Sequence, residues 1–208
     1  MLNKLVMALK RLARHCLRPI LRRKRFMMRD SEIGRKSLLS LIESLPSEGP
    51  MIMIEIGSYR GESAQIFLST SRFSRIYCID PWKMYYDAND GAAFTDMAAV
   101  ERDFDERVGG DKRVIKVKGT IDTFLEQYPD IKIDFAYVDG CHTYDAVKHD
   151  LQCILSSCPP RVAVAGHDYA DKLWEGVNRA IEECIGKPDK VFPDTSWCKY
   201  QDRSNSPS

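Results

Sequence analysis

The stretch MIMIEIGSYRGES, residues 51–63, decides the fold. It is apolar up to its first glycine except for Glu55, which is the pattern of a strand covered on both faces. Gly57 and Gly61 then open a turn, because glycine accepts backbone conformations that other residues avoid. A helix is expected over residues 62–71. A buried strand, a glycine turn and a helix in succession predict a parallel α/β unit.

The same alternation continues along the chain on both sides of this unit. Further strands are predicted over residues 75–82, 113–120, 133–140, 161–169 and 196–200. Further helices are predicted over residues 34–45, 121–128, 144–157 and 173–184, with a loop and helix over 85–107. Because parallel strands need crossover connections, the pattern predicts an α/β, Rossmann-like, doubly wound and mainly parallel sheet with helices on both faces.

Notable residues stand where the predicted strands end. They are Gly57, Asp80, Thr120, Asp139, His167 and Asp168. Ligand sites of open α/β sheets lie outside the carboxyl ends of the strands. We therefore expect one crevice to collect these residues.

The glycine loop favours a nucleoside ligand without a phosphate cradle. Its pattern is Gly-x-x-x-Gly, with Ser58 and Tyr59 where a dinucleotide-binding fingerprint would continue, and it lacks the Gly-Lys-Ser/Thr of a P-loop. Asp80 lies 19 positions after Gly61, where doubly wound folds place an acid on ribose hydroxyls. Trp82 follows at a place where it could flank an adenine, although ordinary packing is the favoured interpretation.

Two acids at predicted strand ends suggest a cation site. Asp139 and Asp168 could offer oxygen ligands to Mg²⁺, and His167 could be a third ligand. His142 is a candidate general base, because imidazole titrates near neutral pH. Cys141 is a poor candidate nucleophile, since adjacent side chains on an extended chain point in opposite directions.

Charge is divided unevenly along the 208 residues. Residues 1–30 hold ten of the 31 basic residues and one of the 30 acids. Apolar residues recur at helical spacing over 2–28, which predicts a basic amphipathic helix. This arm could pack on the body or a partner, or lie on an anionic membrane surface. Nucleic-acid binding is disfavoured, because the arm holds one aromatic residue and the body is acidic.

The remaining features bound the domains and the compartment. We expect a catalytic domain over residues 31–201 and a disordered tail over 202–208. Seven cysteines without a two-residue spacing disfavour a zinc knuckle and indicate a reducing compartment. No apolar run is long enough to span a membrane. The predicted location is the cytoplasm, with the arm allowing peripheral contact with the inner membrane surface.

The most specific segments, VDGCHTYDAVKHDL (138–151) and AGHDY (165–169), resemble class I S-adenosylmethionine (SAM) methyltransferases. They are most similar to the small-molecule O-methyltransferases grouped with macrocin O-methyltransferase and the cephalosporin hydroxylase-like proteins, over about residues 50–185. The resemblance implies that SAM is bound by Glu55, Gly57, Gly61 and Asp80, with Ser58, Trp82 and Thr120 as further candidates. It also implies Mg²⁺ near Asp139, His167 and Asp168.

The chain departs from the family pattern at two positions. Cys141 stands where many members have a second acid, and His167 stands where many have the first of two adjacent acids. These changes bear on the metal and on the base, for which Asp139 and His142 are the candidates.

The expected function is transfer of a methyl group from SAM to a hydroxyl of a sugar, glycan or other small polyhydroxylated acceptor. Two alternatives are an NAD(P)-dependent oxidoreductase, which the missing third glycine disfavours, and a non-catalytic module that docks through residues 1–28. A homo-oligomer is compatible with either role.

Overall fold

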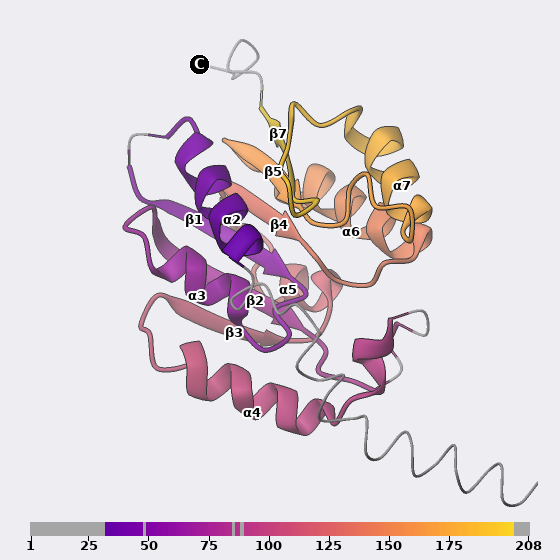
Figure 1. The fold of residues 1–208 in the computed structure, drawn as a ribbon. Coiled ribbons are helices and arrows are strands. Elements are labelled where there is room, and N and C mark those ends of the chain that lie inside the picture. The colour runs from indigo at the N-terminus through magenta and orange to yellow at the C-terminus, as the bar shows by residue number, and fades with distance from the viewer. Residues whose placement is uncertain (1–31, 48, 85, 88–89, 202–208) are drawn as a thin grey trace, which may run out of the picture.

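The computed structural model describes residues 32–47, 49–84, 86–87 and 90–201 (Figure 1). In this part of the chain, seven strands form one sheet in the order β3-β2-β1-β4-β5-β7-β6. The strands are β1 Met51–Ile56, β2 Phe73–Asp80, β3 Val114–Lys118, β4 Phe135–Val138, β5 Ala163–Gly166, β6 Lys190–Val191 and β7 Trp197–Tyr200.

Helices cover both faces of the sheet. They are α2 Glu32–Ser44, α3 Glu62–Leu68, α4 Met97–Val108, α5 Ile121–Gln127, α6 Tyr144–Ser157 and α7 Glu175–Ile185, with a 3₁₀ turn η1 at Gly91–Phe94. Figure 1 and the two core clusters place α2, α3 and α4 on one face and α5, α6 and α7 on the other. The predicted doubly wound, mainly parallel fold is confirmed.

The strand order reverses between β1 and β4. Strands β1 to β5 pair in parallel, whereas β7 runs antiparallel between β5 and β6. Crossovers leave in opposite directions from β1 and β4, so the loops after these strands part and form a crevice. The antiparallel direction of β7 and the short strand β6 did not follow from the sequence pattern.

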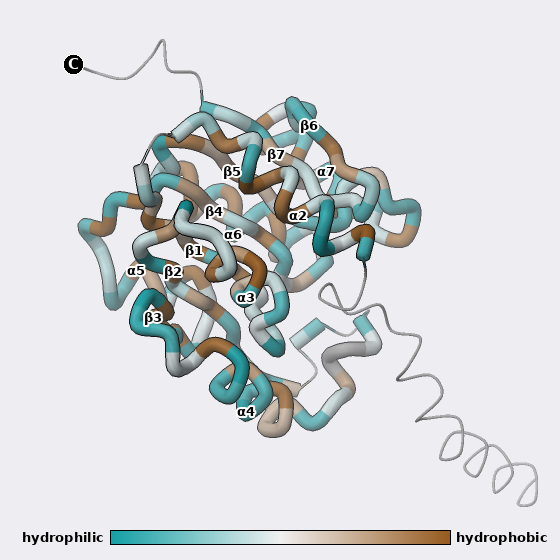
Figure 2. Tube along the Cα trace, turned by 60° about the vertical axis from the view of Figure 1, so that its left-hand side comes forward, coloured by the Kyte–Doolittle hydropathy of each residue, from teal (hydrophilic) through white to brown (hydrophobic). Residues whose placement is uncertain are grey.

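Each face of the sheet has its own apolar core. On the first face, the ring of Phe67 makes edge contacts with Phe73, Phe135 and Tyr137 at centroid distances of 5.3–6.1 Å. On the second face, Phe124 packs edge-on against Tyr77 at 5.3 Å. Figure 2 shows hydrophobic segments along the inner strands and hydrophilic ones along the outer parts of the helices.

Element boundaries differ from the predicted ones for local reasons. Strand β2 ends at Asp80 rather than at residue 82, because Pro81 has no N–H to donate to the sheet. Helix α3 ends at Leu68 rather than at residue 71. There the hydroxyls of Ser69 and Thr70 donate to the carbonyls of Ile66 and Phe67 and so close the last turn.

The arm predicted over residues 1–30 and the tail over 202–208 lie outside the described residues. The domain boundaries therefore stay a prediction. Within the described chain, no helix combines the length and the apolar character needed to cross a bilayer.

The same substitution at Leu41 and at Leu173 tests how α2 packs on the first face of the sheet. Leu41 on the inner side of α2 is fully buried, whereas Leu173 is 81% exposed. Leu41→Ala should lower the free energy of unfolding by about 2–5 kcal/mol, because it leaves a cavity in the core. Leu173→Ala should change it by less than about 0.5 kcal/mol. Denaturant unfolding of both variants measures this, and equal losses would contradict the assigned packing of α2.

Candidate active site

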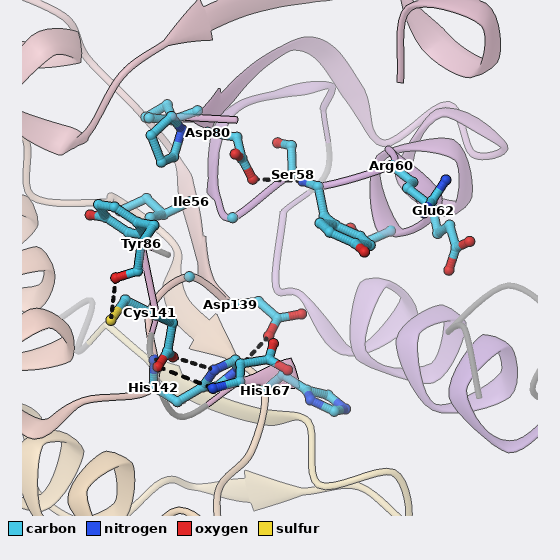
Figure 3. Close-up of a pocket in the computed structure, with 18 of the residues that line it drawn as sticks. Ile56, Ser58, Arg60, Glu62, Asp80, Tyr86, Asp139, Cys141, His142 and His167 are labelled. Atoms are coloured by element: carbon cyan, nitrogen blue, oxygen red, sulfur yellow. Dashed lines mark hydrogen bonds and ion pairs between the residues drawn. The ribbon is translucent and has the colours of Figure 1, made fainter. Parts of the chain in front are cut away.

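A cavity of about 950 Å³ opens at the carboxyl edge of the sheet (Figure 3). It is lined by residues from the loops after β1, β2, β3, β4 and β5. The predicted residues that line it are Gly57, Ser58, Asp80, Thr120, Asp139, His142, His167 and Asp168. Glu55, Gly61 and Trp82 stand outside the lining. The predicted single crevice is therefore present, and three of the predicted residues lie behind the residues that line it.

The two glycines of the loop after β1 allow its backbone to follow a path that a side chain would block. Gly57 has φ 89°, and a Cβ there would collide with the backbone carbonyl of Asp139. Gly61 has φ 73° at the start of α3, and a Cβ there would lie 3.0 Å from the Phe104 and Val108 side chains. Both positions thus need glycine, and Gly57 lets the loops after β1 and β4 lie in contact.

Glu55 supports the loop from below. Its side chain is fully buried and accepts hydrogen bonds from the hydroxyls of Ser58 at 2.6 Å and Ser63 at 2.5 Å. Burial raises the pKa of Glu55 to about 7, although both hydrogen bonds favour the ionised form. Direct contact of Glu55 with a cofactor stays a prediction, and its position gives it a role in holding Ser58 and the start of α3.

Asp80 ties the end of β2 to the glycine loop. Its carboxylate accepts the backbone N–H of Tyr59 at 2.8 Å and of Trp82 at 2.7 Å. Burial raises the pKa of Asp80, although both backbone hydrogen bonds favour its ionised form. A carboxylate has about four acceptor positions, so two remain for hydroxyl groups of a ligand.

Trp82 packs in the core rather than on the cavity wall. It is 5% exposed, its ring lies 5.0 Å from that of Phe104, and the Lys116 ammonium stands 4.8 Å from its centroid. Its indole N–H donates to the Tyr59 carbonyl at 2.8 Å. The ordinary-packing interpretation of Trp82 therefore describes its surroundings, and contact with an adenine would require the ring to move.

Three residues at or near the cavity have strained backbone. Tyr59, Trp82 and Asp168 have φ values of 45°, 41° and 65°, which side-chain-bearing residues rarely adopt. The hydrogen bonds of Asp80 hold the first two in place. Residues kept in sparsely populated conformations tend to cluster at functional sites. Two of these residues, Trp82 and Asp168, are among those that the sequence singled out, and Ala170 and Thr195 have positive φ as well.

Thr120 starts α5 and also lines the cavity. Its side chain and that of Thr123 form a reciprocal capping box at the start of that helix. The cap fixes the backbone of the β3–α5 loop, which forms part of the cavity wall.

His142 is held from three sides at the other end of the cavity. Its Nδ1 lies 3.0 Å from the Asp87 carboxylate and its Nε2 lies 2.9 Å from that of Asp168. Its ring stacks on Trp174 at a centroid distance of 4.4 Å. Burial alone would lower the pKa of His142, but these carboxylates and Asp139 raise it to about 9. Both ring nitrogens face carboxylates, an arrangement that favours the protonated imidazolium.

Four acids and two histidines gather at this end of the cavity: Asp87, Asp139, Asp168 and Asp194 with His142 and His167. Asp139 Oδ1 lies 4.0 Å from His142 Nε2, beyond hydrogen-bond distance, and burial raises the pKa of Asp139. Burial also disfavours the ionised form of Asp168, but hydrogen bonds from His142 and His167 hold its pKa well below the usual range. His167 Nδ1 lies 3.1 Å from Asp168, and its Nε2 lies 3.9 Å from Asp194.

The histidine that joins the two predicted metal-binding acids is His142. Donor atoms of Asp139, His142 and Asp168 all lie within 4.8 Å of one another. His167, the predicted third ligand, lies with its Nδ1 3.1 Å from Asp168, and its role as a ligand stays a prediction. Figure 3 shows Asp139, His142 and His167 gathered on the side of the cavity opposite Ser58 and Asp80.

Sequence reasoning missed four residues that shape the cavity: Asp87, Asp150, Trp174 and Asp194. Asp87, Trp174 and Asp194 lie in loops, where no periodicity marks them. Asp150 had a signal, because it interrupts the apolar face of α6 formed by Val147, Leu151 and Ile154. Burial raises its pKa to about 7.

The oxidoreductase alternative gains nothing from the structure. Such enzymes use a Tyr-x-x-x-Lys pair, and Tyr144 and Lys148 have this spacing. The Lys148 ammonium donates to the Tyr144 hydroxyl at 2.7 Å, and both contact Glu183 on α7. Neither residue belongs to the cavity lining, so the pair is a surface contact between two helices.

A family model described as a methyltransferase domain, methyltransferase family 24, matches residues 54–169. The match runs from β1 to the loop after β5 and covers more than half of the chain. The chain belongs to this methyltransferase family. It is thus an enzyme of the SAM-dependent methyltransferase class, and SAM is the cofactor expected for it.

Solved structures share the fold of this methyltransferase. CalS11, a calicheamicin methyltransferase, has a TM-score of 0.60 at 18% identity over 82% of this chain and 80% of its own. Its apo form, titled a TDP-rhamnose 3′-O-methyltransferase, gives 0.59 at 20% identity over 82% and 81%. Spermidine synthase from Thermotoga maritima gives 0.54 at 11% over 83% and 60%. No curated protein matches the sequence of the chain.

The buried side chain of Glu55 predicts how the stability of this methyltransferase depends on pH. Because the pKa of Glu55 is raised from 4.5 to about 7, its ionised form costs stability as pH rises through that window, and below pH 4.5 the cost is absent. Glu55→Gln should therefore gain about 3 kcal/mol in unfolding free energy relative to the wild type between pH 4.5 and pH 7.5.

Denaturant unfolding at the two pH values measures this gain. Glu126→Gln, at an exposed position on α5, is the control and should show no such trend. A stability difference between Glu55→Gln and the wild type that does not change with pH would contradict the assignment.

Proposed function

We propose that this methyltransferase transfers the methyl group of SAM to a hydroxyl of a sugar, glycan or other small polyhydroxylated acceptor. The observation that carries the proposal is the two-sided cavity. One side offers the acceptor oxygens of Asp80 beside the glycine loop, and the other gathers Asp139, Asp168 and His142. The similar fold of CalS11, a sugar O-methyltransferase by its title, supports this acceptor class.

The first side suits the cofactor in size and chemistry. A cavity of about 950 Å³ lies within the range of small-molecule sites and leaves room for an acceptor. Asp80 would hold the ribose hydroxyls, and the backbone at Gly57 and Ser58 would face the amino-acid part. Ile79 and Ile121 supply apolar wall for a purine. When bound, SAM supplies a methyl group on a positively charged sulfur.

Asp139 is the residue placed to take a proton from the acceptor. Its side chain lines the cavity and is 22% exposed, and its closest approach to His142 Nε2 is 4.0 Å. Lone pairs of its carboxylate therefore remain for an acceptor hydroxyl. Burial raises the pKa of Asp139, which makes the carboxylate a better proton acceptor.

His142 positions the acid side of the cavity rather than acting as the base. Both of its ring nitrogens are engaged by carboxylates, which leaves no lone pair to receive a proton. The stacked Trp174 ring and Asp87 fix its orientation. The Asp87 contact also brings the insert between β2 and α4 to the cavity, where Tyr86 lines the wall. This insert is the natural place for acceptor contacts.

The same acids could also hold a divalent cation. The carboxylates of Asp139 and Asp168 suit Mg²⁺, and His142 lies in the same group with both of its nitrogens facing carboxylates. We propose that Asp139 and Asp168 would hold Mg²⁺, which would supply a positive charge beside the acceptor oxygen.

Asp139→Asn tests the catalytic assignment. The amide cannot take a proton, so turnover should fall about a hundredfold or more. Binding of S-adenosylhomocysteine by calorimetry should stay close to that of the wild type, because the substitution is on the other side of the cavity. Turnover is measured with methyl-labelled SAM and a panel of sugars and hydroxylated metabolites. Asp145→Asn, at an exposed acid on α6, is the matched control.

Three outcomes of that assay separate the alternatives. Full activity of Asp139→Asn would contradict Asp139 as the base. Wild-type turnover that persists in EDTA would contradict the proposed cation site but not the proposed methyl transfer. S-adenosylhomocysteine binding without turnover on any acceptor would favour the non-catalytic module.

A further inference from the structure

A second group of side chains of metal-ligating type lies on the outer surface, away from the cavity lining. Asp122 is in the first turn of α5, and His149 and Cys153 lie one turn apart on α6. His149 Nε2 is 2.9 Å from Asp122 Oδ1 and 3.6 Å from Cys153 Sγ, and Cys153 Sγ is 4.0 Å from Asp122 Oδ1. The three donor atoms therefore converge on one point.

The separations match those of a tetrahedral zinc site. Bonds of about 2.3 Å to sulfur, 2.05 Å to nitrogen and 2.0 Å to oxygen place the ligand atoms about 3.5 Å (S–N), 3.5 Å (S–O) and 3.3 Å (N–O) apart. The observed separations of 3.6, 4.0 and 2.9 Å differ from these by about 0.5 Å or less. Small side-chain rotations would bring all three atoms to bonding distance.

The chemistry of the donors also selects the ion. One thiolate, one imidazole and one carboxylate form a set that suits Zn²⁺ or Co²⁺ and suits Mg²⁺ poorly. His149 and Cys153 are four residues apart, so they lie on the same side of α6. The Thr120 hydroxyl donates to Asp122 Oδ2 at 3.2 Å, as an outer-shell partner that orients the carboxylate.

We propose that Asp122, His149 and Cys153 bind a zinc-class ion, with water as the fourth ligand. The site joins two segments that also form the cavity wall. Thr120 and Ile121 precede Asp122, and Asp150 follows His149, and all three line the cavity. An ion here would fix the start of α5 to α6 and so brace this wall from outside. Without an ion, the same atoms form a hydrogen-bonded surface cluster.

Cobalt titration of the reduced, EDTA-treated full chain tests the proposal. A thiolate ligand gives Co²⁺ a charge-transfer band in the near ultraviolet, and a four-coordinate site gives strong visible bands. We expect both to saturate at one equivalent and to disappear when Zn²⁺ is added. Cys153→Ser should abolish the near-ultraviolet band, and His149→Gln and Asp122→Asn should each weaken binding at least about tenfold.

Two further cysteines serve as controls. Cys184 on α7 is a half-buried thiol at a different place in the fold, and Cys141 is the thiol of the cavity. Cys184→Ser and Cys141→Ser should leave the band unchanged. A missing band in the wild type, or a band that survives Cys153→Ser, would overturn the site. Mg²⁺ at Asp139 and Asp168 gives no thiolate band, so the result is independent of the proposed function.

Thermal unfolding gives a second readout. Zn²⁺ should raise the midpoint of the wild type and of Cys184→Ser, because an ion that binds the folded state stabilises it. It should not raise the midpoint of Cys153→Ser. An equal rise in all three proteins would show binding elsewhere and would contradict the proposal.

Discussion

The contact between the backbone of Gly57 and the carbonyl of Asp139 is the constraint on which the site depends. A side chain at Gly57 would collide with that carbonyl, so the two loops on either side of the strand-order reversal can meet only with glycine there. Parallel pairing of β1 with β2 and β4 sets the loops at one edge of the sheet. Asp80 then fastens the glycine loop to the end of β2 through two backbone amides. The cavity is the space that these attachments leave open.

The charges of the cavity follow from that geometry. Asp139 and Asp168 leave neighbouring parallel strands, so their carboxylates must lie close together and need a cation between them. His142 meets this need within the chain, since Asp87 and Asp168 hold both of its nitrogens. A divalent ion would compete with the imidazolium for the same carboxylates. The departures from the family pattern at Cys141 and His167 therefore bear on how the acids are neutralised rather than on whether a cofactor fits.

Much of this arrangement could be predicted from the sequence. Strand ends in parallel sheets are easy to recognise, so the sequence predicts Asp80, Thr120, Asp139 and Asp168 in one crevice. Three residues near those ends were harder to place, because periodicity does not tell which side of a loop a side chain takes. Glu55 lies under the loop, Gly61 caps α3 and Trp82 packs on Phe104. Asp87, Trp174 and Asp194 reach the cavity from irregular segments, where tertiary contacts alone decide position.

Calorimetric titration with S-adenosylhomocysteine tests the central claim, that the Asp80 side of the cavity holds the cofactor. The wild type should bind one equivalent, and Asp80→Asn should bind about 10- to 100-fold more weakly, since a charge-assisted hydrogen bond contributes about 1.5–3 kcal/mol. Circular dichroism establishes that the variant is folded, and Asp145→Asn should bind like the wild type. No binding by the wild type, or undiminished binding by Asp80→Asn, would contradict the account.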